Sequence, residues 1–227
     1  MRFDGLSLLL AALVLTLTTV VLLYSGPYIG RSEGGEKHYA LLLLLCGAII
    51  GLGSAGDLFN LWLWFETMAI TSYPLVVFYT RDRLALEAGV KYLVQSSAGS
   101  VFILIGIALV LLSTGTLDVL DVRLSLVNAA VPAAVWLTAG VLFVIGFGVK
   151  VALVPLHTWL PDAHAQAPSG ISALLSAVVI EAGLIALLRS WSALAGAAVS
   201  WGALLIGFGI FNMFLGNLLA LRQQQVK

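Results

Sequence analysis

The chain has 227 residues, of which 61% are hydrophobic and only 10% are charged, and its mean hydropathy is +1.07. Soluble domains carry roughly 25% charged residues, so this composition excludes a soluble globule and predicts an integral membrane protein. Its expected location is the cell (inner) membrane. The 11 Lys and Arg residues balance 11 Asp and Glu residues, and no basic stripe exists to neutralise phosphates, which excludes nucleic acid as a partner.

Apolar segments alternate with mostly short connections along the whole chain. A membrane-spanning helix needs about 20 apolar residues to cross about 30 Å of hydrocarbon. Seven segments meet this requirement: about 6–24, 39–56, 58–80, 85–112, 133–153, 170–190 and 200–221. They predict an all-α membrane protein, an up-and-down bundle in which the two longer connections, 25–38 and 113–131, are loops.

The first apolar segment is predicted to be a retained helix. Its run of about 19 residues is too long for the apolar core of a signal peptide, and Asp4 stands where a basic region belongs. The basic residues then suggest the orientation of the chain. One set of segment ends carries more of them (Arg31, Lys37, Arg81, Arg83, Arg222, Lys227) than the other (Arg2, Arg123, Arg189). The positive-inside rule therefore predicts an N-terminus outside and a C-terminus in the cytoplasm.

The third and fourth segments contain ionisable residues. Glu66 lies about nine residues into the third segment, roughly 13 Å deep at 1.5 Å per residue. Such groups are expensive at this depth and indicate a functional site by default. Lys91 lies about six residues from the cytoplasmic end of the fourth segment. Two interpretations of Lys91 stay open: its amine reaches the headgroups, or it belongs to a proton path.

The fifth segment is predicted to be a broken helix. Gly146 and Gly148 precede Lys150, and Pro155 follows, so the break is expected at the glycines, with Lys150 beside the carbonyls that it frees. The sixth segment is expected to start near Ser169, a residue type favoured at the N-cap. It reaches Glu181 after about twelve residues, again close to the middle of the membrane.

The polar stretch between these two segments contains His157, Asp162 and His164. Their spacing does not match a zinc-binding helix motif, so the stretch is expected to provide helix caps, loop hydrogen bonds or a proton uptake path. The single cysteine, Cys46, has no companion for a disulfide or a metal site and is interpreted as a packing residue. No metal, cofactor or redox centre is expected in this chain.

Two long motifs, GDLFNLWLWFETM and PLHTWLPDAHAQAPSGISALLS, and the glycine-lysine break before the second, resemble a known family. Its members are the antiporter-like, proton-translocating membrane subunits of respiratory complex I, of Mrp-type sodium/proton antiporters and of membrane-bound hydrogenases. Such subunits usually have about fourteen helices, which include two inverted five-helix repeats. The resemblance implies a single membrane domain over 1–227, equivalent to the N-terminal half of such a subunit: a leading helix and loop (1–38), a five-helix repeat (39–190) and the start of a following repeat (191–227).

The resemblance also implies roles for individual residues. Glu66 matches the glutamate of the family's fifth helix, and Lys150 matches the lysine of the broken helix. Glu181 stands where many members carry a second lysine, so the chain departs from the pattern there and offers a second acid near Lys150. A buried Glu and Lys favour each other's charged form while desolvation opposes both, which couples their proton affinities. The predicted proton-translocation residues are Glu66, Lys91, Lys150, His157, His164 and Glu181.

Three functions stay open on this basis. The first is a proton- or cation-translocating subunit of a complex I-like NADH/quinone or related redox-driven complex, with Glu66 and Lys150 as the coupled pair. The second is a subunit of a Mrp-type sodium/proton antiporter. The third is a non-conducting membrane scaffold. The expected partners are the lipid bilayer and other membrane subunits, including a chain that supplies the missing second repeat.

Overall fold

A computed structural model describes residues 1–29, 34–79, 82–128, 131–195 and 201–222. These residues form helices, with no strand among them. The helices are α1 (Gly5–Ile29), α2 (Gly35–Gly53), α3 (Leu58–Val76), α4 (Arg83–Thr114), α5 (Val119–Asn128), α6 (Ala133–Val151), α7 (Trp159–Gln166), α8 (Ser169–Leu174), a π-helical turn (Leu175–Val179), α9 (Ile180–Ala193) and α10 (Trp201–Ala220). The predicted all-α fold is confirmed.

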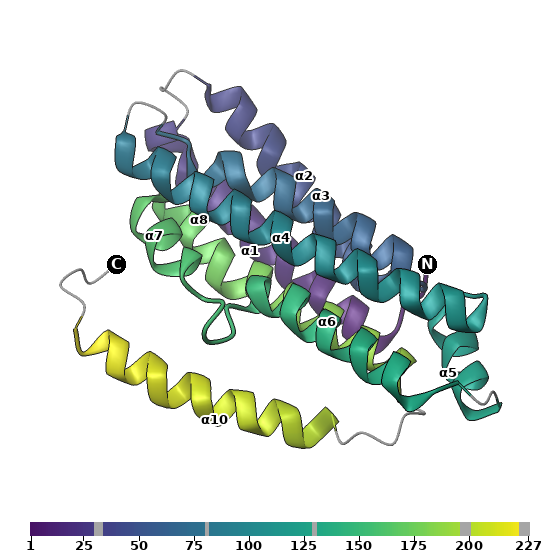
Figure 1. Cartoon of the computed structure of the whole chain (residues 1–227). Coiled ribbons are helices and arrows are strands. Elements are labelled where there is room, and N and C mark those ends of the chain that lie inside the picture. The colour runs from purple at the N-terminus through teal and green to yellow at the C-terminus, as the bar shows by residue number, and fades with distance from the viewer. Residues whose placement is uncertain (30–33, 80–81, 129–130, 196–200, 223–227) are drawn as a thin grey trace.

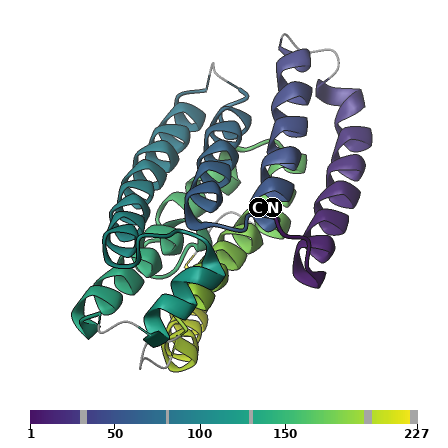
Figure 2. The same ribbon diagram turned by 90° about the vertical axis from the view of Figure 1, so that its right-hand side faces the viewer.

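Six helical spans in the described part of the chain are long and apolar enough to cross a membrane. They are Gly5–Pro27, Gly35–Gly53, Arg83–Thr114, Ala133–Val151, Ser169–Ala193 and Trp201–Ala220. Each lies on a predicted segment. The seventh predicted segment forms α3, which falls outside the six because Asn60, Glu66 and several hydroxyl residues lower its hydropathy. It nevertheless packs between α2 and α4 within the bundle (Figures 1 and 2).

Two glycines let α4 and α6 pack in close contact. A Cβ added to Gly146 would lie 2.6 Å from the carbonyl oxygen of Gly99, and one added to Gly99 would lie 2.9 Å from that of Gly146. Small residues at such crossings allow the backbones of membrane helices to approach closely. This contact sets the position of the end of α6, which carries Lys150, against the first half of α4.

The break in the fifth span lies later than the glycines predict. Helix α6 continues through Gly146 and Gly148 and ends at Val151, and Ala152 has a left-handed φ of 56°. The break therefore follows Lys150. The glycines serve helix packing instead, whereas Pro155 has no N–H to continue the helix and disfavours helical backbone before it.

Two further predictions about local structure are wrong. Pro168, not Ser169, is the N-cap residue of α8, and no side chain caps that helix. The predicted loop 113–131 contains α5. Backbone hydrogen bonds tie the start of α5 to the corner between α2 and α3: Val119 N–H donates to Gly56 O at 3.2 Å, and Leu58 N–H donates to Leu117 O at 3.0 Å. Tertiary contacts therefore order α5, a helix too short to be recognised as a span.

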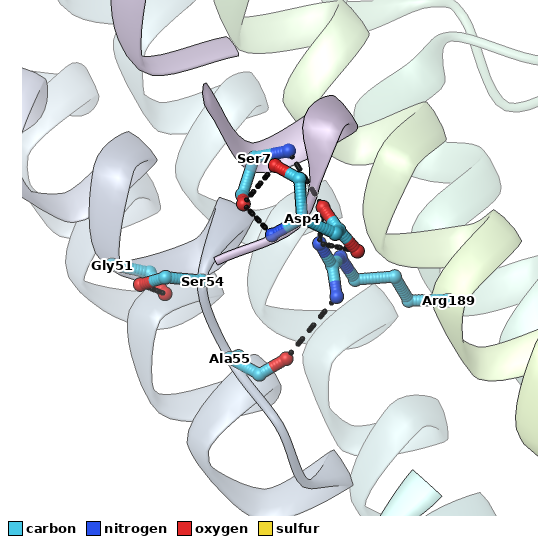
Figure 3. A network of polar contacts seen from close by, with 6 residues as sticks. All are labelled: Asp4, Ser7, Gly51, Ser54, Ala55 and Arg189. Carbon is cyan, nitrogen blue, oxygen red and sulfur yellow. Dashed lines mark hydrogen bonds and ion pairs between the residues drawn. The ribbon is translucent and has the colours of Figure 1, made fainter. Parts of the chain in front are cut away.

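The start of α1 is fastened to the end of α9 (Figure 3). The Ser7 N–H donates to Asp4 Oδ1 at 2.8 Å, and Arg189 Nη2 lies 3.0 Å from each carboxylate oxygen of Asp4. The Ser7 N–H and the positive charge of Arg189 lower the pKa of Asp4 against the opposing effect of desolvation. This places Arg2 and Arg189 at one end of the bundle, as predicted. Which end faces the cytoplasm stays a prediction.

Helix α10 runs beside the bundle and buries none of its residues (Figure 1). It contacts the rest of the chain through Trp201, whose ring stacks on Trp191 with centroids 5.0 Å apart. It also contacts the chain through Asn212, whose Oδ1 accepts a 2.7 Å hydrogen bond from the Val154 N–H. The division of the chain into a leading helix, a repeat and the start of another repeat stays a prediction.

Candidate functional site

Lys150 lies in the last turn of α6 with a fully buried side chain, 0% exposed. Its Nζ donates to Tyr92 Oη of α4, and lies 3.4 Å from Ser72 Oγ of α3. The two hydroxyls are themselves 2.9 Å apart. Three helices thus bring an amine and two hydroxyls into one buried hydrogen-bonded cluster, which we call the Lys150 cluster.

Aromatic rings enclose the Lys150 cluster. Lys150 Nζ lies 4.6 Å from the ring centroid of Tyr92 and 5.7 Å from that of Tyr73, distances at which a cation is attracted to the ring face. Tyr92 stacks on Trp159, with centroids 4.1 Å apart and ring planes inclined by 11°. The Trp159 indole N–H donates to Val149 O at 2.6 Å, a carbonyl that also accepts a 3.2 Å hydrogen bond from the Ala152 N–H at the end of α6.

Glu66 lies on α3 with a partly buried side chain. Its Oε1 is buried without a hydrogen-bond partner. Six residues separate it from Ser72, about 9 Å along the helix axis, and no ion pair links Glu66 to Lys150 in the described structure. Tyr73 follows Glu66 by seven residues, two helical turns, so the two lie on one face. The Tyr73 ring packs edge-on against the Tyr92 ring, with centroids 4.8 Å apart. Tyr73 therefore connects the face of α3 that carries Glu66 to the Lys150 cluster.

Lys91 is 47% exposed and forms two ion pairs, with Glu87 Oε1 and with Asp162 Oδ2, each at 2.8 Å. One turn further along α4, Gln95 Nε2 donates to Thr158 Oγ1. These contacts bind one polar face of α4 to the segment after the break. Lys91 therefore lies at the surface next in sequence to Tyr92, and both interpretations of Lys91 remain predictions.

The two histidines of this segment have different environments. His157 is partly buried, and its Nδ1 has no hydrogen-bond partner. His164 Nδ1 lies 2.7 Å from Ser172 Oγ, and its Nε2 lies 3.3 Å from Ser176 Oγ, so His164 joins α7 to the following span. Among the described residues, no group of three His, Cys, Asp or Glu side chains is placed to hold a metal ion.

Glu181 lies outside the Lys150 cluster. It is exposed near the middle of the Ser169–Ala193 span and has no hydrogen bond or ion pair within the described structure. The neighbour of Lys150 on α9 is Gly183, where an added Cβ would lie 3.3 Å from both Cβ and Cγ of Lys150. Two residues turn an α-helix by about 200°, so Glu181 faces away from Lys150, and the structure does not bring the second acid to the amine.

Sequence reasoning missed the immediate partners of Lys150, namely Ser72, Tyr73 and Tyr92, and it also missed Trp159, which stacks on Tyr92. Each is a polar or amphipathic side chain within or next to an apolar segment that also carries an ionisable residue. That signal identifies polar faces of helices. It does not identify which faces meet.

Residues 55–227 match the family described as NADH:quinone oxidoreductase/Mrp antiporter, transmembrane. The NADH-quinone oxidoreductase subunit N of Desulfitobacterium hafniense is 34% identical over 219 residues, which cover 95% of this chain and 44% of that protein. A Na+/H+ antiporter subunit of Alkalihalophilus pseudofirmus is 32% identical, covering 99% of this chain and 28% of that protein. A chain of an archaeal membrane-bound sulfane sulfur reductase superposes with a TM-score of 0.79 at 33% identity, covering 95% of this chain and 45% of that one. The chain spans less than half the length of these proteins.

Proposed function

Because this multi-pass integral membrane protein belongs to the NADH:quinone oxidoreductase/Mrp antiporter transmembrane family, we propose that it is a proton-translocating subunit with Lys150 as its titrating centre. The observation that carries this proposal is the fully buried amine held by the neutral hydroxyls of Tyr92 and Ser72. Ionisable groups inside membranes mark proton relays and ion paths. A lysine suits the task because it changes protonation readily when buried, whereas arginine stays charged.

The Lys150 cluster provides a continuous path for a proton. Hydroxyl groups both donate and accept hydrogen bonds. The lysine ammonium can therefore give a proton to Tyr92 Oη while the tyrosine passes its own proton to Ser72 Oγ, which lies 2.9 Å away. Tyr92 thus receives one proton and releases one, and Ser72 in turn releases its own hydroxyl proton to water, so Lys150 becomes neutral and both hydroxyls are unchanged. Reloading of the neutral amine from the other side completes the cycle.

Glu66 is the proposed modulator of this cycle. An ionised Glu66 favours the charged form of a nearby lysine, and a protonated Glu66 removes that preference. Two unit charges about 9 Å apart at an effective dielectric constant of about 20 interact by about 2 kcal/mol, so a carboxylate and an amine without direct contact still change each other's proton occupancy by about one order of magnitude.

The driving reaction and the partners belong to the same proposal. Relatives named as subunits of an NADH-quinone oxidoreductase and of a Na+/H+ antiporter match this chain with similar identities. A redox-driven complex is the first proposal, and a Mrp-type sodium/proton antiporter is the second. In both, further membrane subunits surround the chain in the cell membrane. Flavin or iron–sulfur subunits that copurify with the chain would identify the redox-driven complex.

Substitution of Lys150 tests the proposal against the scaffold interpretation. We expect Lys150→Ala to abolish proton pumping by the assembled complex in vesicles, while Arg222→Ala, which removes an exposed cation, leaves pumping intact. Copurification of the partner subunits is the control for assembly. Normal pumping by an assembled Lys150→Ala complex would reject the proposal and favour a scaffold.

A further inference from the structure

A groove follows α2 where it packs beside α3. A cavity of about 340 Å³, lined in part by Lys37, Leu41 and Phe78, lies at one end. A second cavity of about 430 Å³, lined in part by Leu44 and Trp64, lies further along the same two helices. Lys37, Leu41, Leu44 and Ala48 are spaced by four, three and four residues, so they follow one face of α2.

Two nitrogen-bearing side chains lie at the start of this groove. Lys37 is exposed and has no hydrogen bond or ion pair in the described part of the chain. His38 is only 1% exposed and lines the first cavity, and neither of its ring nitrogens has a hydrogen-bond partner among the residues that the structure describes. Buried polar groups are normally hydrogen-bonded. Among the described residues, the groove therefore begins with a cation and an imidazole that have no hydrogen-bond or ion-pair partner, and both suit an anionic oxygen ligand.

The remaining length of the groove suits an acyl chain. Eleven residues of α2 separate Lys37 from Ala48, about 16 Å along the axis, and one leaflet of the hydrocarbon core is about 15 Å thick. The indole of Trp64 closes the inner end, since a Cβ on Gly51 would lie 2.4 Å from Trp64 Cδ2. At Gly47, an added Cβ would meet no atom within 4 Å, so the groove is open at that point.

We propose that this groove is a binding site for an anionic phospholipid. The phosphate lies at Lys37 and His38, and one acyl chain follows Leu44 and Gly47 to Trp64. The positive charge at one end, the apolar lining beyond it and the match to one leaflet select a phospholipid over a helix of a partner subunit. The site is separate from the proposed proton transfer, because Ser72 lies on the opposite side of α3 from Thr67 and Pro74, which line the cavities.

The test measures thermal unfolding of the full chain in detergent while phosphatidylglycerol is added, with phosphatidylcholine of the same acyl chains as the comparison. We expect a saturable rise in Tm with phosphatidylglycerol alone. Lys37→Ala should weaken the apparent affinity about fivefold, the contribution of one basic residue near an anionic lipid surface. Gly47→Leu, which fills the open part of the groove, should abolish the effect. Arg83→Ala, which removes an exposed cation at the same end of the bundle but outside the groove, should leave it unchanged.

Several results would overturn the proposal. An equal loss of apparent affinity for phosphatidylglycerol in Lys37→Ala and Arg83→Ala would mean that the lipid is attracted by general surface charge. An unchanged response in Gly47→Leu would place the lipid elsewhere, and equal responses to the two lipids would exclude headgroup recognition. If Gly47→Leu unfolds without lipid, the comparison of Lys37→Gln with Arg83→Gln decides between a site and surface attraction.

Discussion

The Tyr92 hydroxyl links the two other members of the Lys150 cluster, and its removal is the sharpest test of the proposed proton path. In Tyr92→Phe, the ring that stacks on Trp159 at 4.1 Å stays in place, while the hydroxyl that meets both Lys150 Nζ and Ser72 Oγ is lost. Ser72 keeps its 2.8 Å hydrogen bond to Ala69 O. The variant therefore removes the hydrogen bonds of the Tyr92 hydroxyl and leaves the stacking of the ring on Trp159 unchanged.

The expected effect follows from the strength of the lost bond. A hydrogen bond to a charged group contributes about 1.5–3 kcal/mol, which corresponds to about a 10- to 150-fold change in a rate that depends on it. We expect the rate of proton pumping by Tyr92→Phe to fall at least about tenfold. The bundle should stay folded, because one satisfied bond of Ser72 and all ring contacts remain.

The assay is acidification of vesicles that contain the assembled complex, followed with a pH-sensitive dye. Tyr79→Phe is the matched control, since Tyr79 is exposed and outside the cluster. Copurification of the partner subunits shows whether assembly is normal. Pumping by Tyr92→Phe at the rate of Tyr79→Phe, with equal assembly, would refute the role of this hydroxyl.

Three other predictions concern carboxylates. Glu66→Gln should slow pumping by about one order of magnitude in the same vesicle assay, because it removes the negative charge that favours the protonated form of Lys150 without direct contact; an unchanged rate would mean that Glu66 does not modulate the amine. Glu181→Lys should lose activity in the assembled complex, since an exposed mid-span carboxylate needs a partner from another chain; full activity would contradict this. The lowered pKa of Asp4 stabilises the fold above its unfolded value of about 3.9, and this stability is lost as pH falls through the folded value. Asp4→Asn should thus lower Tm slightly at neutral pH, a loss of less than about 1 kcal/mol of stability because the side chain is half exposed, and the difference should vanish as pH falls through the lowered pKa of Asp4; a constant difference across pH would exclude Asp4 ionisation as its cause.

The membrane character and the positions of the spans were predictable from the sequence. Hydropathy is a local property, and the bilayer demands about 20 apolar residues wherever a helix crosses it. The same reasoning identified Lys150 as an ionisable residue at depth beside a helix break, because charges and prolines stand out in an apolar segment. It misplaced the break, since glycines allow close helix packing as readily as they end a helix, and Gly146 does the former.

Tertiary structure alone decided what surrounds those residues. Ser72 and Tyr92 come from two separate helices, and Tyr92 meets Lys150 because the backbones of α4 and α6 touch at Gly99 and Gly146. The sequence determined which segments enter the membrane and which side chains are costly there. Contacts between residues far apart in the chain decide which helix faces meet. Because of these contacts, Tyr92 lies against the Lys150 amine and Glu181 faces away from it.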